Sequence, residues 1–195
     1  MSDKPHWLRA EGPGWRSESS RTVYENPWIS IVEHQAVAPT GRPALYGVVG
    51  FKNLALAILP VHADGTVTLI GQNRFPAMDY SWEIPEGGGP LGIDPLLSAQ
   101  RELREEAGLE AAQWVEVLRT QLSNSVTDEQ AIGYLALDLS PAPADPDETE
   151  LLAVARVPFR EALDAAMAGH MPDMLTVAML LRGYHMAREG ALPRE

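Results

Sequence analysis

The chain has 195 residues, of which 45% are hydrophobic, a size and composition that suit one globular domain with a substantial core. It contains no cysteine, which excludes disulfides and thiolate metal sites, and its net charge of −12 argues against binding to nucleic acid or to an anionic membrane. No apolar run approaches the ~18–20 residues of a transmembrane helix and the N-terminus has no apolar signal region, so we expect a cytoplasmic protein without membrane spans.

The N-terminal quarter of the chain favours β-structure. Alternating apolar residues after position 21 predict strands, with turns at Asn26-Pro27 and at 39–43. The expected divisions of the chain are a loose arm at 1–20, an N-terminal β-element at 21–52 and the main domain at 53–190.

The main domain opens with a continuous apolar run at 54–61, which predicts a strand buried on both faces. The turn Ala63-Asp64-Gly65 follows, and we expect 66–72 to return beside the first strand as a hairpin. Later elements are predicted as strands at 113–121, 131–139 and 151–157, and as helices at 160–169 and 172–188. The core side of the last helix is predicted to consist of Met174, Val177, Ala178 and Leu181.

The most informative stretch is 81–109, which has the pattern of a short strand, a glycine-rich loop and a helix. Asp94 is a favourable N-cap, Pro95 suits the first helical position, and Gly108 is the natural stop after the last turn. The apolar side that we expect to face the core consists of Leu96, Ala99, Leu103 and Ala107.

The last turns of this helix carry Glu102, Glu105 and Glu106. The C-terminal end of a helix dipole favours cations, and like charges three or four residues apart repel each other. Arg101 can pair with Glu105, but an excess of carboxylate remains. A bound Mg²⁺ or Mn²⁺ ion would neutralise such an all-oxygen cluster; a solvated, charged helix face is the alternative that the charge pattern leaves open.

The run 87–92 also satisfies G-x-G-x-x-G between a strand and a helix, the pattern of a dinucleotide-binding fold. In that fold the helix begins inside the glycine motif, whereas here Asp94-Pro95 starts it after the last glycine. The rest of the chain also lacks alternating βαβ units. A dinucleotide-binding oxidoreductase is therefore the weaker alternative.

The segment Arg101-Glu102-Leu103-Arg104-Glu105-Glu106-Ala107-Gly108-Leu109 matches the REUxEExGU core of the Nudix box, and Gly87 stands where that box begins. The chain therefore resembles the Nudix hydrolases, which cleave nucleoside diphosphates linked to another moiety. One position departs from the box, because Ile93 occupies the place of a glutamate six residues after the first glycine. In the family that glutamate orients the box arginine, so we expect weaker rather than absent activity.

Two shorter segments resemble the ADP-ribose pyrophosphatases in particular. Gln72-Asn73-Arg74 precedes Glu83-Ile84-Pro85-Glu86-Gly87, as a Q-x-R motif whose arginine contacts phosphate precedes a similar segment in those enzymes. Thr127-Asp128-Glu129 resembles a loop that supplies a water-activating glutamate. The resemblance implies phosphate binding by Arg74 and proton abstraction by Glu129, with Asp128 as the reserve candidate.

The resemblance also implies a fold and a ligand set. The expected fold is an α/β/α Nudix sandwich with a mixed sheet, preceded by a β-element that helps to build a homodimer. Mg²⁺ or Mn²⁺ would bind Glu102, Glu105 and Glu106, with a backbone carbonyl near Glu86 as a further ligand, and Arg101 would fix the carboxylates. Trp28 would stack on the base of the substrate; the alternative is a half-buried aromatic residue of a strand.

The expected activity is metal-dependent hydrolysis of the pyrophosphate bond of ADP-ribose or a related nucleoside diphosphate sugar. The products are a nucleoside monophosphate and a sugar phosphate. The alternative is a Nudix domain that binds a nucleotide without turning it over, because Ile93 replaces the box glutamate.

Overall fold

The computed structural model describes residues 4–191, and the chain forms two compact units. The first unit comprises Met1–Lys52 with Ser123–Asp128, and the second comprises Asn53–Leu122 with Glu129–Glu195. Residues 1–3 of the expected N-terminal arm lie outside the described residues. No helix within 4–191 has the length and apolar character needed to cross a membrane.

The first unit is an antiparallel sheet in the order β1-β2-β3. Its strands are β1 (Arg16–Glu25), β2 (Ile29–Val37) and β3 (Pro43–Phe51). The strand β1 begins inside the segment 1–20 that we expected to be loose, because Arg16 pairs with Val37 and the Ser17 hydroxyl lies 2.9 Å from Nδ1 of His34. The polar residues of this arm are therefore compatible with an exposed strand.

The loop 123–128 belongs to the same unit because it is hydrogen-bonded to β3. The Val49 N–H donates to the Val126 carbonyl at 2.9 Å. The Phe51 N–H donates to Oδ1 of Asp128 at 2.8 Å. The Asp128 carboxylate thus serves to attach the loop to the end of this strand.

The second unit contains two sheets and three helices. A mixed sheet has the order β7-β4-β9-β8, in which β4 and β9 are parallel, and a second sheet has the antiparallel order β10-β5-β6. The strands are β4 (Asn53–Pro60), β5 (Thr66–Arg74), β6 (Asp79–Glu83), β7 (Glu86–Pro90), β8 (Leu109–Gln121), β9 (Gln130–Pro141) and β10 (Ala153–Pro158). The helices are α1 (Pro95–Ala107), α2 (Phe159–Met167) and α3 (Met174–Arg188).

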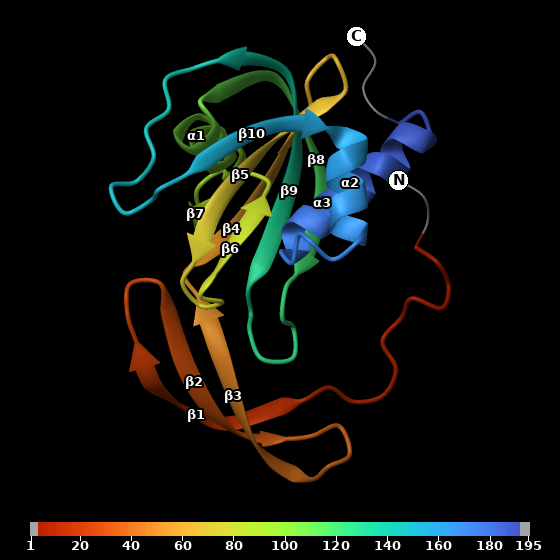
Figure 1. The fold of residues 1–195 in the computed structure, drawn as a ribbon. Helices are drawn as coiled ribbons and strands as arrows, with labels where there is room; N and C mark the ends of the chain where they lie inside the picture. The colour runs from red at the N-terminus through yellow and green to blue at the C-terminus, as the bar shows by residue number, and fades with distance from the viewer. Residues whose placement is uncertain (1–3, 192–195) are drawn as a thin grey trace. The chain divides into compact units, whose positions relative to one another are not determined.

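In the second unit α1 lies on one side of the strands and α2 and α3 lie on the other (Figure 1). The strand β4 explains these layers, because its side chains alternate between two cores. Leu56 and Ile58 pack in the cluster that includes Leu103 of α1. Ala57 and Leu59 pack in the cluster that α2 and α3 complete. The predicted double-sided burial and the α/β/α arrangement with an N-terminal β-element are therefore confirmed.

Two local expectations around this core are only partly confirmed. The predicted turn after β4 is present, because the His62 N–H donates to the Thr66 carbonyl and Val61 forms an antiparallel bridge with Val67, but β4 and β5 then separate into different sheets. The expected glycine-rich loop is partly a strand, because Gly87, Gly88 and Gly89 pair with β4 as the edge strand β7. The parallel βαβ layout of a dinucleotide-binding fold is not present among the described strands.

The helix α1 has the predicted ends. The Asp94 side chain accepts from the Leu96 N–H, Pro95 occupies the first turn, and Gly108 ends the helix in the left-handed region at φ 61°.

The helix α3 buries a different side from the one we expected. Met174 is 67% exposed and Leu181 is 42% exposed. The residues that face the core are Leu175, Thr176, Met179, Leu180, Gly183 and Met186. Apolar residues occur on several sides of this helix, so their periodicity does not identify the buried side.

Candidate active site

The carboxylates of the Nudix-like box lie on the side of α1 that faces the protein. Glu102 is 8% exposed and Glu106 is 5% exposed, beside Leu103, which is fully buried. Carboxylates are rarely buried to this extent without a partner. The reading of this helix as having a wholly solvated charged face is therefore wrong for these two residues, and they need charge compensation.

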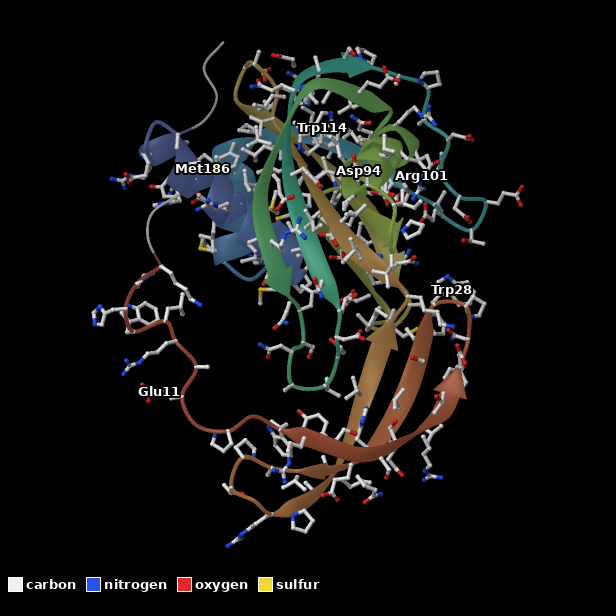
Figure 2. All side chains as sticks on the ribbon, turned by 180° about the vertical axis from the view of Figure 1, so that it is seen from behind. Glu11, Trp28, Asp94, Arg101, Trp114 and Met186 are labelled. Carbon is white, nitrogen blue, oxygen red and sulfur yellow. The ribbon has the colours of Figure 1, made fainter. Side chains whose placement is uncertain are left out.

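Arg101 supplies part of this compensation. Its guanidinium pairs with both Glu102 and Glu105, and it also donates to the carbonyl of Gly88 at 3.2 Å. The arginine therefore ties two box carboxylates to the edge strand β7. Figure 2 shows Arg101 on α1, and Ile93, just before the helix, is 52% exposed.

The third carboxylate is held from the main chain. The Glu86 N–H donates to Oε2 of Glu106 at 3.0 Å. Burial raises the pKa of Glu106 to about 8; the hydrogen bond from Glu86 opposes this shift, whereas the negative charges of Glu102 and Glu150 add to it. Burial also raises the pKa of Glu102, although Arg101 opposes the shift.

Gly87 leaves the space that Glu102 occupies. A Cβ atom at position 87 would overlap the carboxyl carbon of Glu102, whereas a Cβ at the neighbouring Gly88 would lie 3.5 Å from Nδ2 of Asn53. The first glycine of the box is therefore required by the close approach of β7 to a carboxylate of α1.

The carboxylates fit Mg²⁺ or Mn²⁺ by their chemistry. All of them offer oxygen ligands, which these ions prefer. Glu102 and Glu106 are buried, and burial disfavours the charged form of both. Among residues 4–191 no three acidic or histidine side chains are already gathered as a metal site. Arg101 holds Glu102 and Glu105 in this structure, so a cation would have to share or replace these ion pairs.

Arg74, at the end of β5, is engaged with a carboxylate that the sequence pattern did not assign a role. Its Nε donates to Oε2 of Glu83 at 2.9 Å, and its Nη2 contacts the same oxygen. Glu83 is 2% exposed, whereas the Arg74 side chain is 41% exposed. The buried carboxylate thus fixes a guanidinium that still reaches solvent.

The Glu86 side chain is engaged by residues at the start of α3. Oγ1 of Thr176 donates to Oε1 of Glu86 at 3.4 Å and accepts from the Ile84 N–H at 3.0 Å. Asp173 caps α3 by accepting from the Thr176 N–H at 2.6 Å. Burial, followed by the charge of Asp173 and a hydrogen bond with it, raises the pKa of Glu86.

One cavity of about 800 Å³, which we call the acidic cavity, is lined by the two ion-paired residues Arg74 and Glu83 and by Glu86 and Asp173. Its charged lining consists of Arg74, Asp79, Glu83, Glu86, Glu129 and Asp173. Glu129 therefore lies at the cavity that Arg74 lines, whereas Asp128 belongs to the first unit and accepts from Phe51. The two neighbouring acids have different structural roles.

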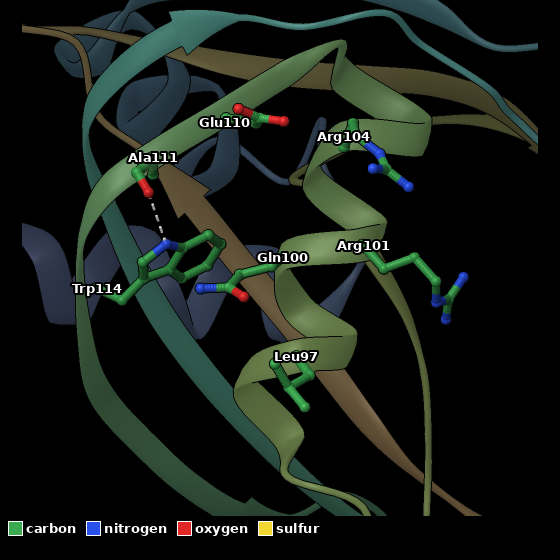
Figure 3. Close-up of a pocket in the computed structure, with 7 residues that line it drawn as sticks. All are labelled: Leu97, Gln100, Arg101, Arg104, Glu110, Ala111 and Trp114. Carbon is green, nitrogen blue, oxygen red and sulfur yellow. Dashed lines mark hydrogen bonds between the residues drawn. The ribbon is translucent and has the colours of Figure 1, made fainter.

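Other predicted contacts are placed elsewhere. Trp28 lies in the first unit, where it is 66% exposed and its backbone N–H donates to Oδ1 of Asn26. It is therefore not the half-buried strand aromatic of the alternative. A second cavity of about 520 Å³ lies between the outer side of α1 and β8 (Figure 3). It is lined by Arg101, Arg104 and Trp114, but by none of the box glutamates.

The sequence patterns did not identify Glu83, Glu150, Asp173, Thr176 or Ser81 as residues of the site. Glu83 is the first residue of the Glu83-to-Gly87 segment that resembles the ADP-ribose pyrophosphatases, so this resemblance could have indicated a role for it at the site. Asp173 was expected only as the start of a helix. Nothing local in the sequence indicates that Glu150 lies close enough to raise the pKa of Glu102 and Glu106.

Comparisons with known proteins agree with this architecture. The family model of the nucleoside diphosphate sugar hydrolase N-terminal domain matches residues 15–49, and that of the NUDIX domain matches residues 52–177. An ADP-ribose pyrophosphatase of Mycobacterium tuberculosis (strain ATCC 25618 / H37Rv) is 27% identical over 179 residues, which are 90% of this chain and 86% of that protein. A methanol dehydrogenase activator of Bacillus methanolicus is 30% identical over 157 residues, which are 80% of this chain and 84% of that protein.

A crystal structure described as that of an ADP compounds hydrolase matches with a TM-score of 0.83, covering 94% of this chain and 100% of that chain. The two sequences are 19% identical, so this likeness shows the fold alone. The matches of the two family models cover most of the described residues. The chain therefore belongs to the Nudix hydrolases and carries a nucleoside diphosphate sugar hydrolase N-terminal domain.

Proposed function

We propose that the protein hydrolyses the pyrophosphate bond of ADP-ribose or a related nucleoside diphosphate sugar in the presence of Mg²⁺ or Mn²⁺. The products are a nucleoside monophosphate and a sugar phosphate. The observation that carries the proposal is the pair of buried box carboxylates, Glu102 and Glu106. Glu106 accepts from the N–H of Glu86, a residue that lines the same cavity as Arg74 and Glu129. The 27% identity to an ADP-ribose pyrophosphatase supports the choice of substrate.

Nudix hydrolases typically depend on a divalent metal, which here would be held by Glu102, Glu105 and Glu106 with the carbonyl of Glu86. When bound, the metal neutralises phosphate charge and acidifies water. Arg101 holds Glu102 and Glu105 by ion pairs and is itself fixed to β7 by its hydrogen bond to the Gly88 carbonyl.

Arg74 and Glu129 carry the remaining steps. The exposed part of the Arg74 guanidinium binds a phosphate oxygen while Glu83 fixes its orientation. Glu129 accepts a proton from the attacking water while the oxygen of that water forms a bond to one phosphorus atom. The bridging P–O bond then breaks, and the second phosphate leaves with the bridging oxygen.

The test is product analysis by mass spectrometry. The protein is incubated with ADP-ribose, GDP-mannose, UDP-glucose and NADH, with and without Mg²⁺. We expect Mg²⁺-dependent nucleoside monophosphate from at least one compound, and a loss of at least about 100-fold in kcat for Glu129→Gln, within the range of general base catalysis.

Asp128→Asn is the matched control, because Asp128 is adjacent in sequence but its carboxylate accepts from the Phe51 N–H in the first unit. It should retain most of the activity. Equal losses in Glu129→Gln and Asp128→Asn would contradict the assignment of the base. Intact substrates that nevertheless bind would favour the second candidate, a nucleotide-binding module, which Ile93 in place of the box glutamate suggests.

The first unit supports a homodimer as the working form. All ten residues of β1 are exposed, and Ala36 is the one buried hydrophobic residue among the described residues of this unit. A three-stranded sheet needs a covered apolar face to be stable. A second copy would cover the exposed Val23 and Tyr24. Light scattering after size exclusion should give the mass of a dimer, and Tyr24→Asp should shift it toward the monomer.

A further inference from the structure

Ser81, in the middle of β6, has a hydroxyl group for which residues 4–191 provide no hydrogen-bond partner. The residue is 6% exposed and lines the acidic cavity. Buried hydroxyl groups in proteins nearly always have a partner, so this one requires an explanation. Serine has three staggered side-chain positions, and rotation about χ1 turns a hydroxyl at a cavity wall toward a bound molecule.

The position of Ser81 on its strand places it beside the ion pair of Arg74. Alternate residues of a strand share a face, so Ser81 and Glu83 lie on the same face of β6, and Glu83 holds Arg74. Trp82 lies between them on the opposite face and lines a separate, mainly apolar cavity. The hydroxyl is therefore close to the arginine to which phosphate binding is assigned.

The charge of the acidic cavity limits what can bind next to that phosphate. Five carboxyl side chains and one guanidinium line it, and the guanidinium is already paired with Glu83. Ionised carboxylates accept hydrogen bonds and repel other anions. Beyond the phosphate that Arg74 binds, the cavity therefore favours a ligand group that brings hydrogen-bond donors and no further negative charge. Every hydroxyl of a sugar both donates and accepts, whereas a nucleobase carries few donor groups, its amino group or a ring N–H, beside its ring-nitrogen and carbonyl acceptors.

We propose that the acidic cavity holds the uncharged sugar of a nucleoside diphosphate sugar, and that the Ser81 hydroxyl forms a hydrogen bond with one of its hydroxyl groups. This inference rests on the proposed function, since it assigns one end of that substrate to one cavity. Ser81 is then a specificity-determining residue, because it contacts the sugar and takes no part in the bond cleavage.

The first test compares Ser81→Ala with the wild type on two substrates. One is ADP-ribose, and the other is ADP with a methyl ester on its β-phosphate, which has the same base and pyrophosphate without the sugar. We expect KM for ADP-ribose to rise about tenfold with kcat unchanged, since the contact is made equally in the ground and transition states. The methyl ester should show no change. An equal rise for both substrates, or for neither, would overturn the inference.

A binding measurement tests the inference even if the protein hydrolyses none of the substrates. Calorimetry with ADP-ribose in Mg²⁺-free buffer should give about tenfold weaker binding for Ser81→Ala, the equivalent of one lost hydrogen bond. Such a loss without turnover by the wild type would reject the proposed function and support the sugar site. Equal affinities, or no binding by the wild type, would reject the sugar site. Ser81→Ala should unfold at the same or a higher temperature, because it removes a buried hydroxyl without a partner.

The second test uses the charge of the sugar. UDP-glucuronate has a carboxylate where UDP-glucose has a hydroxymethyl group, so the acidic cavity should disfavour UDP-glucuronate. We expect its kcat/KM, or its affinity in the binding assay, to be at least about tenfold lower. Equal or better use of UDP-glucuronate would show that the sugar lies outside the acidic cavity.

Discussion

The N–H of Glu86 and Oε2 of Glu106 are joined by a hydrogen bond of 3.0 Å, which connects the edge strand β7 to the most buried carboxylate of the Nudix box. One main-chain donor does not replace the water that burial removes, and the pKa of Glu106 remains raised to about 8. A proton or a cation must therefore complete the compensation. This relationship makes the site sensitive to pH, to metal and to small changes in β7.

In the metal-free protein we expect stability to fall as the pH rises from about 4.5 to 8. Glu106 stays protonated in the folded state up to about pH 8, whereas the unfolded chain releases this proton near pH 4.5. The folded state thus binds more protons across this window, and the free energy of unfolding decreases by up to about 1.4 kcal/mol per pH unit. Thermal unfolding in EDTA at several pH values measures the slope. Glu106→Gln should flatten it, and an unchanged slope in this variant would assign the effect to other groups.

Gly87→Ala should damage the site far more than Gly88→Ala. The added methyl group at position 87 overlaps the Glu102 carboxyl, whereas at position 88 it meets Asn53 at ordinary contact distance. We expect Gly87→Ala to lose about 1–3 kcal/mol of stability, the usual cost of overpacking, and to bind Mn²⁺ more weakly. Chemical denaturation and Mn²⁺ titration by electron paramagnetic resonance measure both quantities. The idea fails if the two alanine variants behave alike.

Ile93→Glu should lower the Mg²⁺ concentration needed for half-maximal activity. Arg101 now takes its ion pairs from Glu102 and Glu105, the same carboxylates to which we assign metal binding. A carboxylate at position 93 offers the arginine another partner, and a several-fold change is expected from one exposed charge pair. Ile93→Gln has the same side-chain length as the glutamate variant without the charge and serves as the control. If Ile93→Glu leaves both the Mg²⁺ requirement and kcat/KM unchanged, the missing carboxylate has no role.

Thr176→Val should destabilise the protein, while Thr176→Ser should not. The Thr176 hydroxyl accepts from the Ile84 N–H at 3.0 Å and donates to Glu86, and the residue is fully buried. Valine has a similar volume but leaves the Ile84 N–H without its acceptor, at a cost of about 1–3 kcal/mol. Urea unfolding of the two variants measures this difference. Equal stability would show that water replaces the lost acceptor.

Local chemistry made α1 predictable. Its ends depend on residues adjacent in sequence, such as the Asp94 side chain reaching the Leu96 N–H and Gly108 adopting φ 61°. The α/β/α fold followed from the match to the Nudix box and from the double-sided burial of β4. The buried side of α3 was not predictable in this way, because Met174 and Leu175 are equally apolar and only packing distinguishes them.

The sequence alone therefore determined the class of fold, the identity of the box carboxylates and the positions of the caps of α1, all of which depend on residue types at short spacing. Tertiary structure decided which polar groups meet across the chain. It paired Arg74 with Glu83, directed the Glu86 side chain to Thr176, and left the Ser81 hydroxyl at a cavity wall without a partner among the described residues. Hydrogen bonds and burial depend on distances between segments far apart in sequence, and these distances are set only when the sheets and helices pack.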